Sequence, residues 1–255
     1  MKRVVVKVGS AVLTQDAEVA LDRLQALVLF LVELKKKYEV ILVSSGAVSA
    51  GYTKLKLDRT LIRNKQALAA IGQPILMKKY AREFEVHKIT SAQVLVTSAN
   101  LDRDDDIARI KNTIDTLLQN GVVPIVNEND ATSTQELEVG DNDQLSAYIT
   151  KHTDADMLII LSDIDAYYTS DPRVDADAEV LKIVHEIPQE ELQKEATPNN
   201  VFATGGIVTK LKAAAYLLDA DKQIFLASGF DLRDVKSFML DDKHLGGTLF
   251  TKTLL

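Results

Sequence analysis

Short runs rich in valine, isoleucine and leucine alternate along this chain with longer segments of helical hydrophobic spacing, and this alternation restricts the fold. Such short, uniformly apolar runs are typical of strands buried on both faces of a parallel sheet. Parallel strands need long crossover connections, which the helical segments supply. The sequence therefore predicts an α/β fold, an αβα sandwich around a mostly parallel open sheet. The expected strands are Arg3–Val8, Val40–Val43, Gln93–Thr97, Val122–Val126, Met157–Leu161 and Gln223–Ala227.

Apolar side chains recur at helical intervals between these runs, most clearly in segments 21–34 and 107–118. This spacing predicts helices that cover the sheet. Gly121, directly after Asn120, is typical of a helix end. The segment Gln189–Asn200 is expected to be a mobile loop, because it is charged and carries Pro198. Residues 246–250 are expected to form a closing hairpin.

The chain is long enough to bury a large core, with 255 residues of which 46% are hydrophobic. This length suits one large domain or two fused halves. We expect a single domain over residues 1–255. A soft divide near Thr153–Asp156 would separate an N-terminal half, about 1–153, from a C-terminal half, about 154–255.

Composition excludes several classes of site and partner. The chain has no cysteine, which excludes disulfides, zinc–thiolate sites and thiol nucleophiles. A formal net charge of −7 argues against broad binding to nucleic acid or to anionic membranes. The apolar start is broken by Lys7 and is too short for a signal peptide, and no other run is long enough to cross a bilayer. We therefore expect a cytoplasmic protein with neither a nucleic-acid nor a membrane partner.

Polar residues follow the predicted strands where ligands bind in open parallel sheets, beyond the carboxyl ends. These residues are small, hydroxylated, amide or acidic. Such groups suit a small amino-acid-like molecule, whose ammonium pairs with carboxylate or amide oxygens and whose carboxylate needs N–H donors. They are Lys7–Ser10, Ser44–Ala47, Asn127–Asp130 and Ser162–Asp163, with Gly140–Asp143 opening the helix before the Met157 strand.

Two lysines beside glycines indicate a phosphate site. Lys7 precedes Gly9, and Lys210 follows Gly205 and Gly206. Glycine turns let backbone N–H groups approach phosphate oxygens, and a lysine adds a mobile positive charge. Two such elements could hold one triphosphate. Neither a G-x-x-x-x-G-K-[ST] loop nor a G-x-G-x-x-G fingerprint occurs, so a different nucleotide-binding architecture is required.

Each of these features also has a purely structural explanation. Gly9 could belong to an ordinary turn, Lys7 could protect an edge strand from aggregation, and Lys210 could be a solvated helix lysine. Asp141 and Asp143 could cap a helix. The coincidence of all these features at strand ends favours a functional role. The four histidines show no metal-ligand spacing, so no side chain is expected to ligate a metal.

The chain resembles the amino-acid kinase family over nearly its whole length, and within it the members that phosphorylate the side-chain carboxylate of glutamate. The glycine and lysine motifs are shared broadly, whereas the Lys-Gln-Ala, Asn-Glu-Asn-Asp and Gly-Asp-Asn-Asp segments point to the glutamate-specific members. The matching stretches are Val6–Ser10, Val43–Gly51, Lys65–Gln73, Pro124–Asp130, Val139–Ala147, Tyr168–Arg173 and Thr204–Lys210.

The resemblance implies roles for particular residues. The N-terminal half would bind L-glutamate through Ser45, Asp130 and Asn142, and the C-terminal half would bind ATP. Lys7 and Lys210 would stabilise the transferring phosphoryl group while Asp143 holds both lysines. Mg²⁺ would bridge phosphate oxygens with mostly water ligands. The expected ATP contacts are Lys7, Ser162, Asp163, Thr204, Gly205, Gly206, Ile207, Val208, Thr209 and Lys210.

The resemblance also implies partners. Family members are typically homo-oligomers inhibited by L-proline, and their unstable product suggests a hand-off to the reductase of glutamyl phosphate. Helices over Arg63–Ala81 and Asp102–Asn120 are candidate association surfaces. Many relatives carry a C-terminal PUA domain, which we do not expect here. Two alternatives stay open: a kinase of the family with another acceptor, and a catalytically silent regulator that binds nucleotide or amino acid.

Overall fold

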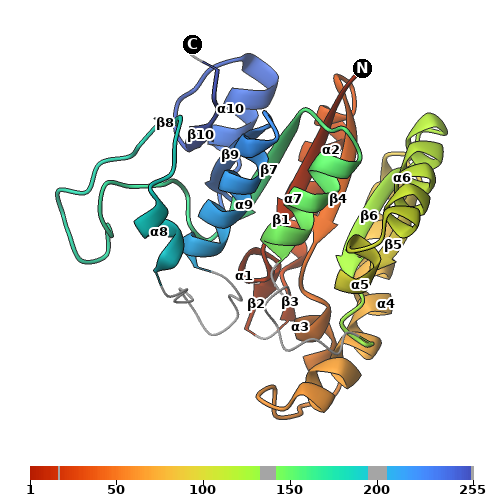
Figure 1. Cartoon of the computed structure of the whole chain (residues 1–255). Helices are drawn as coiled ribbons and strands as arrows, with labels where there is room; N and C mark the ends of the chain where they lie inside the picture. Colours follow the sequence, from red (N-terminus) through yellow and green to blue (C-terminus); the bar gives the residue numbers. More distant parts are fainter. Residues whose placement is uncertain (17, 133–141, 195–205, 254–255) are drawn as a thin grey trace.

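The computed structural model describes residues 1–16, 18–132, 142–194 and 206–253, and their fold is the predicted αβα sandwich (Figure 1). The central sheet has eight strands in the order β5-β6-β4-β1-β7-β9-β10-β8. All six predicted strands are confirmed, with every boundary within two residues of the prediction. The sheet strands are β1 (Lys2–Val8), β4 (Tyr38–Ser44), β5 (Ser91–Val96), β6 (Val123–Glu128), β7 (Met157–Ser162), β8 (Ile183–Val184), β9 (Gln223–Ser228) and β10 (Thr248–Phe250).

The strand β1 occupies an interior position, paired in parallel with β4 on one side and β7 on the other. Lys7 is therefore not an edge-strand residue, and protection of an edge does not explain it. The chain runs from β1 to β4 on one side and later returns from β6 to β7 on the other side, so the carboxyl ends of β1 and β7 flank a topological switch point of the sheet. The helices between the strands are α2 (Leu21–Leu34), α4 (Ile62–Val86), α6 (Asp104–Gln119), α7 (Asn142–His152), α9 (Ile207–Asp219) and α10 (Arg233–Asp241).

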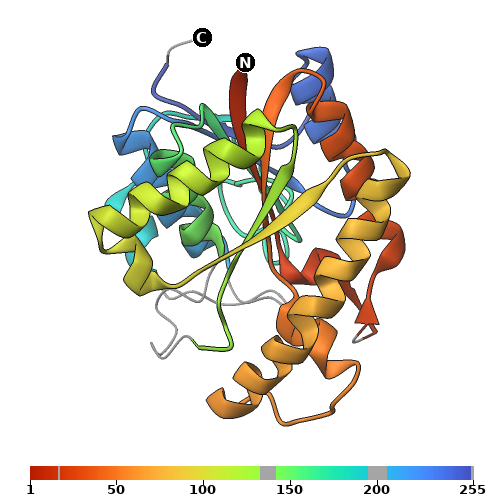
Figure 2. The same cartoon turned by 90° about the vertical axis from the view of Figure 1, so that its right-hand side faces the viewer.

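Alternate residues of each interior strand enter two separate cores, as period-two geometry requires. Val4 and Val6 join the core under α2, α4 and α10, whereas Val5 joins the core under α6, α7 and α9. Figure 2 views the sheet between these two layers, with α6 on one side and α2 and α4 on the other. Lys7 has the same parity as Val5, so it lies under α7 and α9.

Two predictions about connections are wrong. Residues 246–250 do not form a hairpin, because α10 separates β9 from β10, although β10 does pair antiparallel with β9. The segment expected to be a loop from Gln189 begins as a short helix, α8 (Gln189–Gln193), and its remainder from residue 195 lies outside the described residues. Several short elements were not anticipated: α1 (Ser10–Leu13), β2 (Thr14–Gln15), β3 (Glu18–Val19), α3 (Ala47–Tyr52) and α5 (Ser98–Leu101).

The helices α3 and α4 pack backbone to backbone through two glycines. A Cβ atom on Gly72 would lie 1.7 Å from the Ala47 carbonyl oxygen, and one on Gly51 would lie 1.9 Å from the Leu68 carbonyl oxygen. Only glycine permits this approach. The contact fixes the first half of α4 against the turn that follows β4.

Within the described residues, no helix combines the length and apolar character needed to traverse a membrane.

Candidate active site

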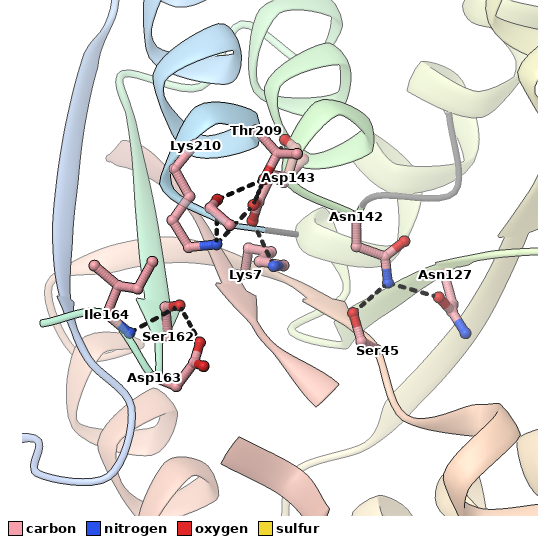
Figure 3. A network of polar contacts seen from close by, with 12 residues as sticks. Lys7, Ser45, Asn127, Asn142, Asp143, Ser162, Asp163, Ile164, Thr209 and Lys210 are labelled. Carbon is pink, nitrogen blue, oxygen red and sulfur yellow. Dashed lines mark hydrogen bonds and ion pairs between the residues drawn. The ribbon is translucent and has the colours of Figure 1, made fainter. Parts of the chain in front are cut away.

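The predicted site residues that the structure describes lie at the carboxyl edge of the sheet, around the ends of β1, β4, β6 and β7, and most of them are labelled in Figure 3. The helices α7 and α9 both begin at this edge, which directs the positive ends of two helix dipoles toward it. Gly46, with a φ of +108°, forms the turn between β4 and α3 in a conformation that favours glycine. The edge is therefore suited to anions even though the protein is acidic overall.

The centre of the site is a buried cluster of two lysines around one aspartate. The Nζ atom of Lys210 lies 3.0 Å from Oδ2 of Asp143, and Nζ of Lys7 forms an ion pair with Oδ1 of the same carboxylate. Lys7 and Lys210 are only 4% and 3% exposed, and Asp143 is fully buried. Thr209 Oγ1 also lies 2.9 Å from Asp143 Oδ2. Residues from β1, α7 and α9 thus meet at one carboxylate.

Electrostatics keep Asp143 ionised. Its burial alone would raise the pKa of the carboxyl group, but the ammonium groups of Lys210 and Lys7 and their hydrogen bonds outweigh burial and hold the pKa below its usual range. The cluster carries two positive charges against one negative charge. Such a cluster has an excess positive charge, which polyphosphate oxygens can compensate.

A second polar group joins Ser45 to Asn142, the residue before Asp143. Asn142 Nδ2 donates to Ser45 Oγ at 2.7 Å and to Asn127 Oδ1 at 2.9 Å. Ser45 follows β4, Asn127 lies in β6 and Asn142 begins α7. The structure therefore brings two of the three predicted glutamate contacts together, one residue from the lysine cluster.

The third predicted glutamate contact, Asp130, lies just beyond β6 beside a cavity of about 170 Å³. This cavity is also lined by Glu128, Gln73 and Gln93. Burial, followed by the charge of Glu128, raises the pKa of Asp130 to about 6, while Lys65 acts in the opposite direction. The cavity is thus an acidic recess that suits an ammonium group. A larger cavity of about 360 Å³, beside Val4, Tyr38 and Met239, is not lined by any of the predicted site residues.

The remaining predicted nucleotide contacts fall into two groups. Ser162 ends β7, where its hydroxyl donates to Asp163 Oδ1 at 3.0 Å and accepts from the Ile164 N–H at 3.2 Å. Gly206 is the N-cap of α9, and Ile207, Val208, Thr209 and Lys210 form its first turn. Thr204 and Gly205 lie outside the described residues, as do residues 133–141 before α7.

Sequence reasoning misses two contributors. Asn127 lies in a strand-end motif but receives no role there, and Gln73 occurs only in a segment that carries the resemblance. Thr209, a predicted nucleotide contact, also donates its hydroxyl to Asp143 Oδ2. Asn127 and Gln73 are both buried amides, at 2% and 8% exposure. A polar residue at the end of a buried strand is a usable signal for Asn127, whereas no pattern singles out Gln73 on its helix.

Comparisons with known proteins agree with this geometry. The sequence profile described as the amino acid kinase family matches residues 2–228. The crystal structure of an isopentenyl phosphate kinase in a substrate complex superposes with a TM-score of 0.66 at 14% identity, over 98% of this chain and 100% of that one, which supports the fold. The chain belongs to the amino acid kinase family.

Within the family, the chain is similar to proteins named glutamate 5-kinase. The protein of that name from Leishmania donovani is 50% identical over 250 residues, which is 98% of this chain and 95% of that protein. The one from Wolinella succinogenes is 49% identical over 257 residues, which is 99% of this chain and 98% of that protein.

Proposed function

We propose that this chain transfers the γ-phosphoryl group of ATP to the γ-carboxylate of L-glutamate, giving L-glutamyl 5-phosphate and ADP, the first step of proline biosynthesis. The observation that carries the proposal is the meeting of Lys7 and Lys210, from opposite ends of the chain, at the single carboxylate of Asp143. The names and identities of the relatives favour glutamate as the acceptor.

The reaction needs no general base, because a carboxylate with an ordinary pKa of about 4.3 is already ionised at neutral pH. One γ-carboxylate oxygen forms a bond to the γ-phosphorus, the bond from that phosphorus to the bridging oxygen breaks, and its electron pair leaves on ADP. Catalysis then consists of alignment and charge stabilisation. Lys7 would stabilise the transferring phosphoryl group and Lys210 the β,γ-bridge, and Asp143 would position both ammonium groups.

Glutamate would bind at the N-terminal side of the cluster. Asp130 is suited to pair with the substrate ammonium, since its cavity concentrates negative charge. Asn142 donates to Ser45 and directly precedes Asp143 in the sequence, so both side chains would contact the rest of the substrate beside the lysine cluster.

ATP would bind at the C-terminal side, along the ends of β7 and α9. Ser162, Asp163 and the residues from Thr204 to Lys210 are the proposed contacts. Mg²⁺ is proposed to arrive with the nucleotide, held by phosphate oxygens and mostly water, and to neutralise phosphate charge.

Three further partners are proposed with this activity. L-Proline would inhibit by occupying the glutamate site, a reductase would consume the short-lived acyl phosphate, and the chain would form a homo-oligomer. The helices α4 and α6 are the candidate association surfaces, and sedimentation velocity would test assembly directly.

The deciding experiment is glutamate-dependent ADP formation in the presence of hydroxylamine, which traps an acyl phosphate as a hydroxamate. Formation of γ-glutamyl hydroxamate supports the proposal. ADP formation with a different acceptor from a substrate panel would assign another activity within the family. Binding of nucleotide without any turnover would point to a silent regulator.

The role of Lys210 is tested by Lys210→Ala, compared with Lys212→Ala. Both lysines lie on α9, but Lys212 is exposed and Lys210 is buried at the cluster. Removal of a donor that stabilises transition-state charge lowers turnover by about 10²–10³-fold. We expect this loss in kcat for K210A and an unchanged kcat for K212A. A kcat near the wild-type value in K210A would remove Lys210 from the mechanism.

A further inference from the structure

A chain of hydrogen-bonded side chains connects the surface of the acidic cavity to the substrate side of the lysine cluster. Gln73 Nε2 donates to Gln93 Oε1 at 3.1 Å, and Asn127 Nδ2 donates to Gln73 Oε1 at 3.0 Å. Asn142 Nδ2 then donates to Asn127 Oδ1 and to Ser45 Oγ. We refer to these five residues as the amide relay. Its members come from β5, α4, β6, α7 and the turn after β4.

A backbone N–H group fixes the donor-to-acceptor direction of the hydrogen bonds in the relay. The N–H of Glu128 donates to Asn127 Oδ1 at 2.9 Å, and a backbone N–H can only donate. Oδ1 of Asn127 must therefore face Glu128 and Asn142, which leaves Nδ2 of Asn127 facing Gln73. Gln73 must in turn present its oxygen to Asn127.

This direction decides what Ser45 and Asn142 offer to a ligand. Asn142 uses its Nδ2 group within the relay, and its Oδ1 is not one of the relay's atoms. Ser45 Oγ accepts a hydrogen bond from Asn142, so the hydroxyl hydrogen of Ser45 is not used in that bond. The relay thus leaves the Ser45 hydroxyl able to donate and the Asn142 Oδ1 atom able to accept. An amino acid needs a donor for its carboxylate and an acceptor for its ammonium group.

Gln73 is the least replaceable intermediate member. It is 8% exposed, and Gly72 beside it holds α4 against the Ala47 carbonyl, so its backbone has little room to move. Without the Gln73 oxygen, Nδ2 of buried Asn127 would lack an acceptor, and an unsatisfied buried donor is costly. Asn127 would then rotate away or loosen, and Asn142 would lose its fixed orientation.

We propose that Gln73 is a positioning residue that fixes, through Asn127, which atoms of Asn142 and Ser45 face the amino-acid substrate. This inference rests on the proposed function. Gln73 also lines the cavity beside Asp130, so the same side chain supports both parts of the substrate site. The effect is on acceptor recognition and leaves the lysine cluster intact.

The test compares three variants in the hydroxamate assay. Gln73→Met keeps the length of the side chain but removes the acceptor, and we expect the KM for glutamate to rise about tenfold or more. The KM for ATP and kcat should change less than about threefold. Gln73→Glu keeps an oxygen toward Asn127, and burial favours its protonated form, which has the donor and acceptor pattern of the amide. Its glutamate KM should stay within about threefold of wild type.

Gln25→Met, at an exposed glutamine in the second turn of α2, is the matched control and should leave all constants unchanged. If Q73M does not yield folded protein, Gln73→Asn carries the same prediction, since its shorter side chain withdraws the amide. An unchanged glutamate KM, or parallel losses in kcat and both KM values, would overturn the positioning role. Absence of hydroxamate from the wild-type protein would instead overturn the proposed function.

Discussion

At the residue scale, the site depends on charges that are held almost out of water. Lys7 and Lys210 are nearly fully buried, and burial of a charge is unfavourable unless it is paired. Asp143 supplies that pairing for both lysines in the free protein. When polyphosphate binds, its oxygens can take over part of this role. Asp143 is thus expected to act in folding as well as in catalysis.

Asp143→Asn should therefore destabilise the free protein, because it leaves two buried ammonium groups without a counter-charge. We expect a loss of about 3–5 kcal/mol in the free energy of unfolding, measured by urea denaturation at neutral pH. The pKa of Asp143 lies below its unfolded value, so wild type should lose this contribution as the pH falls below about 4. MgADP should stabilise D143N more than it stabilises wild type.

The control for that measurement is Asp154→Asn, which removes an exposed partner of Lys111. A surface pair of this kind contributes at most about 1 kcal/mol. Equal losses for the two variants would contradict the role of Asp143 as a buried counter-charge.

Asp130 makes a separate prediction, because its pKa is raised to about 6. The carboxylate is ionised above that pH and can then attract the substrate ammonium. We expect kcat/KM for glutamate, at saturating nucleotide, to fall about tenfold between pH 7.5 and pH 5. Asp130→Asn should have a low kcat/KM at all pH values and lack this acid limb.

Ionisation of Asp130 affects stability in the opposite direction to its effect on glutamate binding. Because the folded pKa lies above the unfolded value, the ionised Asp130 lowers stability at neutral pH, and the folded protein gains stability as the pH falls through about 6. D130N should therefore raise the unfolding midpoint at pH 7.5 while it impairs glutamate binding. An acid limb in D130N identical to that of wild type would assign the titration to another group.

At the scale of elements, the glycine contact between α3 and α4 places both Gln73 and the turn that carries Ser45. Gly72→Ala would ordinarily stabilise a helix interior by about 1 kcal/mol. Here the new Cβ would lie 1.7 Å from a carbonyl oxygen of α3, so the steric term dominates. We expect a loss of about 2–3 kcal/mol or more in unfolding free energy, measured by chemical denaturation.

Ala70→Gly, at an exposed position of the same helix, measures only the difference in helix propensity between alanine and glycine. It should lower the free energy of unfolding by about 1 kcal/mol. If G72A were instead more stable than wild type, the helices would have to separate without cost, and the contact would not position the site.

The elements that could be predicted from sequence are those with a hydrophobic run or a helical spacing long enough to identify a strand or a helix. The strands β1, β4 and β7, and the residues at their carboxyl ends, follow from hydrophobic runs and from the rule that ligands bind at switch points. The pairing of Lys7 and Lys210 at Asp143 required the resemblance, because nothing in local pattern brings residues so distant in sequence together. The amide relay could not be predicted, since amide orientation depends on tertiary contacts. The hairpin expected at residues 246–250 was wrong because α10 intervenes and β10 finds its partners through tertiary packing.

At the scale of the whole molecule, β1 and the lysine cluster join the two halves of the chain. The strand β1 pairs with β4 of the N-terminal half and with β7 of the C-terminal half. The lysine cluster also connects the two halves, because Asp143 precedes the predicted boundary near residue 153 and Lys210 follows it. Without β7 from the C-terminal half, one side of β1 would be an unpaired strand edge.

We therefore predict that the chain unfolds as one cooperative unit despite its two proposed ligand sites. Differential scanning calorimetry should give a single transition whose calorimetric and van't Hoff enthalpies agree. Glutamate and a non-hydrolysable ATP analogue bind different halves in the proposed function, yet each should raise the midpoint of that one transition. Two transitions, of which nucleotide moves only the one from the C-terminal half, would mean that β1 does not couple the halves. In that case, the site between them would have to assemble after each half has folded.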